Sequence, residues 1–370
     1  MAPPLQKFWA RVADGIAVHQ LWAQFRADAR EGFALYAKDV DWDAMRGRSR
    51  WHWFWHVSRA LFWAMVMKLS PPRRVLFVIS LALLVFPRFA YSFDSGNEVN
   101  VNLSLLGAAG LVVLLALELA DRVTMKRDLE IAREIQSWLM PAAPPAVPGL
   151  DIAFATRPAN TVAGDYYDAF FRPAAAGGRL LVVVADVAGK SMPAALLMAT
   201  LQASLRTLAS LPSSLLELVE GLNRYVCAQN PVGHRFTTAF IAELDPASGV
   251  LTYVNAGHNW PALSRASGPI ERLETGGLPL GIMPAARYQM GSAHIGQGDV
   301  LLIFTDGLIE AEDDAQREYG EPRLMELLVR VGAESARETL RRIIGSVEEF
   351  AGAARQHDDI TCLVLRRSAR

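Results

Sequence analysis

The sequence predicts a protein of two parts, a helical membrane region followed by an α+β domain. Three observations carry this prediction. Two strongly apolar stretches fall within residues 75–120, short runs rich in β-branched and aromatic residues begin near Leu150, and segments of helical periodicity are grouped between those runs. Such grouping favours sheets layered against helices over a regularly alternating parallel sheet. At 370 residues the chain is also long enough for two units.

The composition excludes several classes of function. The chain has 37 basic and 38 acidic residues and a net charge of -1, so no excess of one sign would attract nucleic acid, and we expect no such partner. The two cysteines, Cys227 and Cys362, are far apart and lack the spacing of a metal site. This usage suits a reducing compartment and a fold without disulfides.

Residues 1–73 are predicted to form an N-terminal helical region that is cytoplasmic or lies on the membrane surface. The opening segment MAPPLQKFWARVADG lacks the continuous apolar run of a cleaved signal peptide. Residues 51–68, WHWFWHVSRALFWAMVMK, mix tryptophans with Arg59 and histidines, a combination typical of a helix in the headgroup zone. A third, marginal membrane span over this segment is the alternative.

Residues 74–120 are predicted to form a hairpin of two transmembrane helices. A spanning helix needs about 20 mostly apolar residues. Residues 101–120 meet this length, whereas the run at residues 75–86 meets it only if its helix continues through Pro87 and Arg88 to Tyr91, with Arg88 near the headgroups.

The charges around this hairpin predict its orientation. Basic residues occur in KLSPPRR before it and in DRVTMKR after it, and none occurs in the connecting segment SFDSGNEVN. Because basic flanks stay on the cytoplasmic side, we expect both ends of the hairpin there. The alternative is a buried helical hairpin within a soluble domain.

Residues 121–148 are predicted to form a connector helix and a proline-rich linker. One helical stripe follows steps of three and four residues and comprises Leu129, Ala132, Ile135, Gln136 and Leu139. The stripe could pair as a coiled coil in a homodimer, although at under about three heptads it is too short to fix the oligomeric state. The segment PAAPPAVPGL then ends the helix, because prolines cannot continue it.

Residues 149–370 contain the strands and helices of the α+β domain. The predicted strands are LDIAFAT, YYDAFF, RLLVVVAD, FTTAFIAEL, GVLTYVNAG, DVLLIFTDG and DDITCLVL. The predicted helices are MPAALLMATLQASLRTLAS, SSLLELVEGLNRYVCAQN, RLMELLVRVG and ARETLRRIIGSVEEFAGAA. A nucleotide-binding P-loop is excluded in ADVAGKSM, because Val184 stands where that motif requires a glycine.

Aspartates stand at the ends of several very apolar strands. They are Asp165, Asp186, Asp306, Asp358 and Asp359. Any one of them alone is more often a turn former or a helix N-cap. If the sheets bring them together, however, two carboxylates about 4 Å apart repel by roughly 4 kcal/mol at an effective dielectric near 20. A set of such carboxylates therefore indicates multivalent cations, and all-oxygen ligands suit magnesium or manganese rather than zinc.

A series of motifs adds a family resemblance to this reading. In order, they are IAREIQSWLMP, AGDYYDAF, ADVAGKSMPAAL, RFTTAFIAEL, VNAGHNWP, GGLPLGI, FTDGLIEAED and HDDITCLVL. Together, over about residues 129–367, they resemble the SpoIIE/RsbU branch of the bacterial metal-dependent serine/threonine protein phosphatases, the PPM family. The resemblance implies a sandwich of two antiparallel sheets flanked by helices, with a site for two Mn2+ or Mg2+ ions at one end.

The resemblance also assigns roles to individual residues. It implies that Asp165 ligates and bridges both metals, that Asp186 ligates with help from the backbone of Val187, and that Asp306 and Asp358 complete the site. These four aspartates would be the catalytic set.

Other motif residues receive lesser roles. Asp359 is counted among the metal-site residues, with a secondary role, because the wider family often has asparagine there. Asp168 is expected to orient the turn at Asp165. Asn255 and His258 could reach the site, but a turn histidine satisfied by backbone groups is the preferred interpretation.

The activity implied is hydrolysis of phosphoserine or phosphothreonine by a metal-activated water, without a phosphoenzyme. The implied substrate is a signalling regulator, such as a STAS-type anti-sigma-factor antagonist. A catalytically silent scaffold of the same fold and a small-phosphoester hydrolase are the alternatives. The stretch DVAGKS lacks the histidine that eukaryotic relatives carry after their DG, which leaves the proton donor open and makes a metal-bound water the candidate. A bacterial cytoplasmic (inner) membrane location, with the phosphatase domain in the cytoplasm, completes the prediction.

Overall fold

The computed structural model describes residues 50–92, 98–173, 178–189, 191–229, 235–266, 268–332 and 334–368. The chain divides into two compact units, Met1–Val123 and Thr124–Arg370, and each is treated by itself. Of the predicted N-terminal region, residues 1–49 lie outside the described residues.

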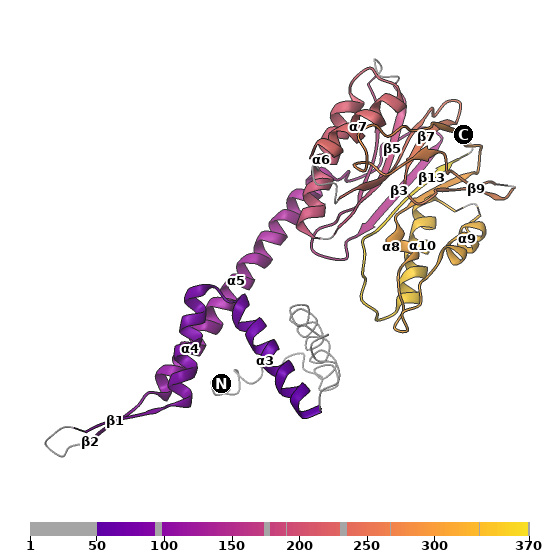
Figure 1. The fold of residues 1–370 in the computed structure, drawn as a ribbon. Coiled ribbons are helices and arrows are strands. Elements are labelled where there is room, and N and C mark those ends of the chain that lie inside the picture. Colours follow the sequence, from indigo (N-terminus) through magenta and orange to yellow (C-terminus); the bar gives the residue numbers. More distant parts are fainter. Residues whose placement is uncertain are drawn as a thin grey trace, which may run out of the picture. The chain divides into compact units, whose positions relative to one another are not determined.

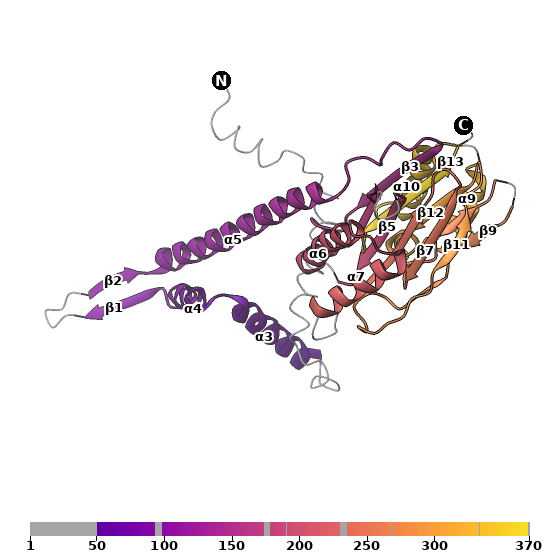
Figure 2. The same cartoon turned by 90° about the horizontal axis from the view of Figure 1, so that it is seen from above.

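In its described residues, the first unit consists of helices and one hairpin of short strands (Figures 1 and 2). Its elements are α3 (Arg50–Lys68), α4 (Pro71–Val85), β1 (Arg88–Ser92), β2 (Glu98–Asn102) and the start of α5 (Ser104–Leu139). Prolines occupy the first positions of α4, where their fixed φ suits a helix and no backbone N–H is missed.

The expected extension of the first apolar run to Tyr91 as a helix is wrong. Helix α4 has 15 residues and ends at Val85. Beyond Pro87 the chain becomes strand β1, which pairs antiparallel with β2 in the register Arg88↔Asn102. Proline lacks the N–H that would bond to the preceding turn, so the helix stops and the strands take up the backbone hydrogen bonds.

Helix α5 is, among the described residues, the one helix long and apolar enough to cross a membrane. Figure 2 shows it as a single uninterrupted helix, and it has 36 residues. Only 11% of its most apolar window is buried. Its exposed apolar side chains include Leu105, Leu106, Val112, Val113, Leu115 and Leu119. This apolar surface without protein cover is what lipid contact would require.

Helices α4 and α5 approach closely at small residues. A Cβ atom added at Gly107 would lie 2.7 Å from the carbonyl oxygen of Ser80, and one added at Gly110 would lie 2.1 Å from its hydroxyl. Small residues allow such backbone approach between membrane helices. Nearer the C-terminal end of the apolar window, Arg73 pairs with Glu118 at 2.8 Å and with Asp121 at 2.6 Å.

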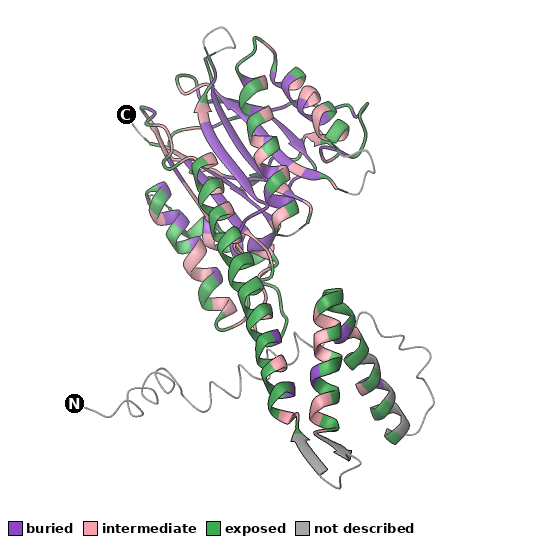
Figure 3. Ribbon diagram, turned by 90° about the vertical axis from the view of Figure 1, so that its left-hand side faces the viewer, coloured by how far each residue is buried: buried purple, intermediate pink, exposed green. Residues whose placement is uncertain are grey.

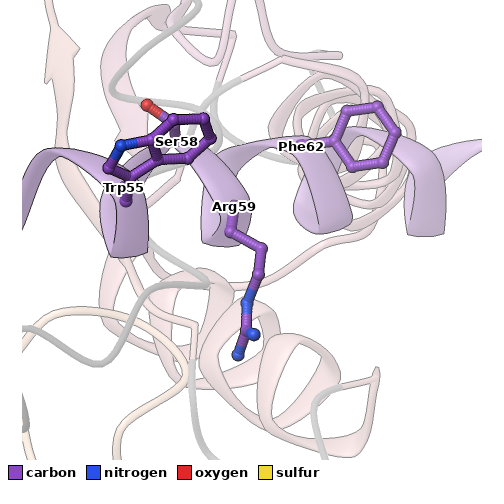
Figure 4. Close-up of a pocket in the computed structure, with 4 residues that line it drawn as sticks. All are labelled: Trp55, Ser58, Arg59 and Phe62. Carbon is purple, nitrogen blue, oxygen red and sulfur yellow. The ribbon is translucent and has the colours of Figure 1, made fainter. Parts of the chain in front are cut away.

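Helix α3 carries a pocket of about 380 Å³, lined by Trp55, Ser58, Arg59 and Phe62 (Figure 4). Two aromatic rings and one guanidinium along a helix match the composition expected at a lipid headgroup zone. None of the predicted site aspartates belongs to it.

The second unit is a sandwich of two sheets. Within the described residues, one sheet has six strands in the order β10-β7-β6-β5-β4, with β11 also paired to β7, and the other has five in the order β3-β13-β12-β8-β9. The strands of the first are β4 (Tyr166–Phe171), β5 (Leu180–Val187), β6 (Thr237–Leu244), β7 (Val250–Ala256), β10 (Gly276–Gly277) and β11 (Gly291–His294). The strands of the second are β3 (Leu150–Arg157), β8 (Ala262–Ser264), β9 (Ile270–Arg272), β12 (Val300–Phe304) and β13 (Ile360–Arg367).

The predicted antiparallel sandwich is confirmed, with a short parallel pairing of β10 and β7 as an exception. Helices cover both outer faces (Figure 1). They are α6 (Met192–Ala209) and α7 (Leu215–Gln229) on the six-stranded sheet, and α8 (Asp306–Ile309), α9 (Glu321–Arg330) and α10 (Ala336–Ala351) on the five-stranded sheet. The result is four layers, helix, sheet, sheet and helix.

Alternation along β5 shows how the sequence builds these layers. Leu181, Val183 and Ala185 belong to the core cluster under α6 and α7. The even-numbered Leu180, Val182 and Val184 belong to the cluster between the two sheets. Side chains alternate across a strand, so Asp186 continues the second set and faces the space between the sheets. The strands of both sheets are accordingly buried in Figure 3.

The C-terminal part of α5 belongs to this second unit. Leu129, Ala132, Gln136 and Leu139 are half-buried, as the predicted stripe requires, but Ile135 is 47% exposed. Ile135 instead shares a second, exposed apolar face with Ile131 and Trp138. After the helix, Met140 packs against two of the core clusters and thereby ties the connector to the sandwich.

Candidate metal centre

The sheet topology brings the predicted aspartates to one end of the sandwich. Asp165 precedes β4 and Asp186 lies near the end of β5, and these strands pair antiparallel with Tyr166 opposite Ala185. In the other sheet Asp306 follows β12 and Asp358 precedes β13, and these strands pair with Phe304 opposite Cys362. Each pair therefore joins the beginning of one strand to the end of its neighbour.

A hydrogen bond joins the two sheets at this end. The Thr305 hydroxyl, on the five-stranded sheet, donates to Asp165 Oδ2 at 2.9 Å, and Thr305 itself accepts from the backbone N–H of Thr361 at 3.0 Å. Asp165 is 1% exposed and Thr305 is fully buried. A buried carboxylate needs such a donor, and Thr305 was missed by sequence reasoning because a threonine before an aspartate carries no signal of its own.

The carboxylates influence one another electrostatically. Burial, followed by the nearby charge of Asp186, raises the pKa of Asp165 well above its usual range. Burial also raises the pKa of Asp186 to about 7, with further contributions from Asp306, Asp358 and Asp359. Desolvation and neighbouring like charges both disfavour the ionised form. A multivalent cation would relieve both effects.

Asp359 uses both carboxylate oxygens to hold the chain that leads into Asp165. The backbone N–H groups of Ala159 and Gly164 donate to them at 2.7 and 2.6 Å. Burial still raises the pKa of this carboxyl, despite the two bonds. The contacts give Asp359 an orienting task that suits the secondary role expected of it, and its role as a metal ligand stays a prediction.

Two glycines permit close backbone approach around the aspartates. A Cβ at Gly164 would lie 3.2 Å from the carbonyl oxygen of Val187, so the predicted backbone ligand lies beside the Asp165 loop. A Cβ at Gly307 would lie 2.1 Å from the carbonyl oxygen of Asp359. A side chain at either position would push apart segments that carry the carboxylates.

Asp168 does not orient the turn at Asp165, contrary to expectation. It is fully buried and accepts hydrogen bonds from the Tyr166 hydroxyl at 2.6 Å and from Arg206 Nε and Nη2, both at 2.8 Å. Arg206 lies on α6, and its guanidinium stacks over Phe170 at 3.8 Å from the ring centre. Asp168 therefore links α6 to β4. It lies two residues after Tyr166 on β4, so both side chains face the helices.

Gln136 of the connector helix reaches the same loop and was also missed as a site residue. Its Nε2 donates to the carbonyl oxygen of Ala163 at 2.7 Å, and its Oε1 accepts from the N–H of Ala163 at 2.9 Å. Ala163 is two residues before Asp165. The signal was present in the sequence, since Gln136 is the polar member of an otherwise apolar stripe.

The residues present fit hard cations by donor chemistry. Carboxylate oxygens and a backbone carbonyl are the ligands that magnesium and manganese prefer. Within the described part of the chain, no three histidine, cysteine, aspartate or glutamate side chains already stand in metal-ligand geometry.

Comparison with known proteins identifies relatives of this domain. Residues 176–368 match the family described as Stage II sporulation protein E (SpoIIE). Phosphoserine phosphatase RsbU of Bacillus subtilis is 31% identical over 245 residues, which cover 66% of this chain and 71% of RsbU. Protein IcfG of Synechocystis is 27% identical over 314 residues, which cover 74% of this chain but only 49% of IcfG.

Solved structures share the fold. The SiaA-PP2C domain of Pseudomonas aeruginosa superposes with a TM-score of 0.59 at 18% identity, covering 67% of this chain and 98% of that domain. The RsbU and RsbW domains of Rv1364c from Mycobacterium tuberculosis give a TM-score of 0.53 at 30% identity, covering 62% of this chain and 63% of that one. The chain thus belongs to the SpoIIE family, and its C-terminal unit is a PP2C-type serine/threonine phosphatase domain.

Proposed function

We propose that this protein is a metal-dependent phosphatase that removes phosphate from phosphoserine or phosphothreonine on a signalling regulator. The observation that carries the proposal is the cluster of buried and half-buried aspartates drawn from both sheets, in which Asp186 has its pKa raised to about 7 by burial and by other carboxylates. Carboxylates that repel one another and have perturbed pKa values are typical of functional sites, and a bound metal would offset their repulsion. RsbU, a relative at 31% identity, is named a phosphoserine phosphatase.

In this proposal Asp165, Asp186, Asp306 and Asp358 hold two Mn2+ or Mg2+ ions, with the carbonyl of Val187 beside them. Such a pair, when bound, lowers the pKa of water and neutralises phosphoryl oxygens. The chain's own contribution is to hold these carboxylates in position. Thr305 supports the anion of Asp165 with a hydrogen bond, and Asp359 holds the preceding loop in place.

We infer a small phosphorylated protein of the STAS type, such as an anti-sigma-factor antagonist, as the substrate. The support is the similarity to RsbU and to the RsbU and RsbW domains of Rv1364c. A catalytically silent scaffold is disfavoured because all four predicted ligands are aspartates in this chain.

We further propose that the protein is anchored in the bacterial cytoplasmic membrane through residues 74–120 and forms a homodimer through the connector. Helix α5 has the length and apolar surface that an anchor needs. The exposed face of Ile131, Ile135 and Trp138 supports pairing with a second copy. The basic flanks of the hairpin support a cytoplasmic phosphatase domain.

The decisive experiment measures phosphate release by the full-length chain in detergent with Mn2+. A phosphoserine protein and p-nitrophenyl phosphate serve as substrates. Asp186→Asn removes one predicted ligand with little change of shape, and Glu349→Gln makes the same chemical change at an exposed position of α10. We expect Asp186→Asn to lose at least about a hundredfold in kcat/KM and Glu349→Gln to match the unmodified chain.

Equal rates for Asp186→Asn and the unmodified chain would refute the metal assignment. Hydrolysis of the small ester alone would refute the protein substrate while leaving the chemistry intact. No hydrolysis of either substrate, with Mn2+ bound, would support the silent scaffold.

A further inference from the structure

His258 occupies a buried position that the proposed activity does not use. It follows β7 in the segment NAGH and is 4% exposed. Its ring atom Nδ1 lies 3.1 Å from the hydroxyl of Thr238, and its backbone N–H donates to Asn255 Oδ1 at 2.7 Å. The other ring nitrogen, Nε2, is buried without a hydrogen-bond partner. The expected satisfaction of this ring by backbone groups is met only in part, through the backbone of Phe304.

The partners of His258 belong to both sheets. Thr238 lies on β6 and is the cross-strand partner of Asp186 on β5. Residues directly opposite in an antiparallel pair have Cβ atoms about 5 Å apart on the same face. The ring also interacts with the backbone of Phe304, at the end of β12 in the other sheet. Phe304 is followed at once by Thr305 and Asp306.

The ring is neutral at physiological pH. Burial lowers the pKa of His258 to about 4, and the backbone of Phe304 acts in the opposite direction with a smaller effect. A neutral imidazole has one nitrogen that donates and one that accepts, so it can link two different polar partners. Because the ring is neutral, it adds no positive charge near the aspartates and does not compete with a metal ion for their carboxylates.

We propose that His258 and Thr238 form a positioning pair that fixes the spacing between Asp186 in one sheet and Asp306 in the other. The carboxylates repel when no metal is bound, so the two sheet ends need a link that resists separation. A buried polar side chain that is only partly satisfied lowers stability, and its presence at this place calls for a function. The inference rests on the proposed function only in that the aspartates bind metal.

The test measures Mn2+ binding by calorimetry on the full-length chain in detergent, with no phosphorylated substrate present. His258→Phe keeps a planar ring and removes both nitrogens, whereas His258→Asn keeps a polar atom near the position of Nδ1. Thr238→Val removes one hydroxyl, and Thr238→Ser restores it. We expect His258→Phe and Thr238→Val to weaken Mn2+ binding about tenfold, the range found for residues that orient metal ligands. Thr238→Ser should stay within about twofold, and His258→Asn should lie between.

The double variant Thr238→Val/His258→Phe should bind Mn2+ no more weakly than the weaker of the two single variants, because the pair acts as one unit. The melting temperature of the metal-free chain separates positioning from folding. A lower melting temperature with unchanged Mn2+ affinity would assign the pair a structural role and overturn the proposal. If His258→Phe does not fold, the comparison of Thr238→Val with Thr238→Ser decides by the same criterion. Weakened Mn2+ binding in a chain that hydrolyses no phosphoester would uphold the pair and refute the proposed activity instead.

Discussion

Asp165, just before β4, and Asp186, on the neighbouring strand β5, have different environments. Asp165 is 1% exposed and receives the Thr305 hydroxyl, whereas Asp186 is half-buried and faces the carboxylates of the other sheet. The ionised form of Asp165 is stabilised by the Thr305 hydroxyl, whereas that of Asp186 would be stabilised by a cation. Both dependences can be tested at single residues.

Replacing Thr305 should weaken metal binding. Thr305→Val removes the donor to Asp165 Oδ2 and the acceptor for the Thr361 N–H. Because a carboxylate without a donor holds its proton more tightly, we expect Mn2+ affinity at neutral pH to fall roughly tenfold and stability to fall by about 1–3 kcal/mol. Calorimetry and urea unfolding would measure the two effects. Thr305→Ser keeps the hydroxyl and should retain most of both, and identical losses in the two variants would contradict this account.

The stability of the metal-free chain should fall as pH rises. The folded state raises the pKa of Asp186 from its ordinary value of 3.8 to about 7, so folded molecules bind this proton more tightly than unfolded ones do. The resulting stabilisation is full below pH 3.8 and is lost as pH rises to about 7, at no more than about 1.4 kcal/mol per pH unit for one proton.

Urea unfolding with a chelator present, at pH values between 4 and 8, would measure how the free energy of unfolding decreases with pH. Asp186→Asn should flatten it, because the amide does not titrate. Saturating Mn2+ should reverse it, since metal binding requires the deprotonated carboxylate. A slope that Asp186→Asn leaves unchanged would assign the pH dependence to other groups.

At the scale of elements, two contacts fasten helices to the site end of the sandwich. Arg206 attaches α6 to β4 through Asp168, and Gln136 attaches the end of α5 to the loop before Asp165. Both contacts are polar groups bonded in pairs, so each fixes orientation as well as distance.

Replacing Arg206 should destabilise the second unit. Arg206→Met leaves the fully buried charge of Asp168 with only neutral donors, and one-sided removal of a buried pair is costly. The side chain of Arg206 is 42% exposed, so water offsets part of the loss and we expect about 2 kcal/mol. Adding Asp168→Asn should recover part of the stability, because the uncompensated charge is then gone. Urea unfolding measures both variants, and a double variant weaker than Arg206→Met would contradict the explanation.

Replacing Gln136 should alter metal binding more than stability. Gln136→Met keeps the length of the side chain but abandons both backbone groups of Ala163. The loop that carries Asp165 then loses one of its supports, and we expect Mn2+ affinity to fall by several fold. Ser137→Ala, on the exposed side of the same helix turn, is the matched control. Unchanged affinity in Gln136→Met would show that the connector does not act on the site through this residue.

At the scale of the whole molecule, the connector offers a surface for a second copy. The side chains of Ile131, Ile135 and Trp138 are 47%, 47% and 71% exposed, at spacings of four and three residues. We expect Trp138→Glu to convert a dimer to a monomer, because a charge would be buried at the seam. Light scattering in detergent would measure the mass. Arg133→Glu introduces the same side chain elsewhere on the helix and should leave the mass unchanged, and a monomeric unmodified chain would refute the dimer.

The sequence by itself determined the features that depend on neighbouring residues. The longer strands of the second unit, the connector helix and the position of each aspartate at a strand end follow from local periodicity and from proline or glycine breaks, whereas the short strands β8, β9, β10 and β11 were not predicted. The α+β class, the antiparallel sandwich and the family were therefore predicted correctly, whereas the metal site formed by the aspartates stays a prediction.

Only the tertiary structure decided which groups meet across the chain. Beyond Pro87 the chain pairs as strand β1 with β2, where apolarity alone suggested that α4 would continue to Tyr91. Asp168 accepts hydrogen bonds from Arg206, 38 residues away, and Asp165 accepts one from Thr305, 140 residues away. Partner choice of this kind depends on how sheets and helices stack, because a hydrogen bond needs its two groups within about 3 Å and local pattern carries no information at that separation.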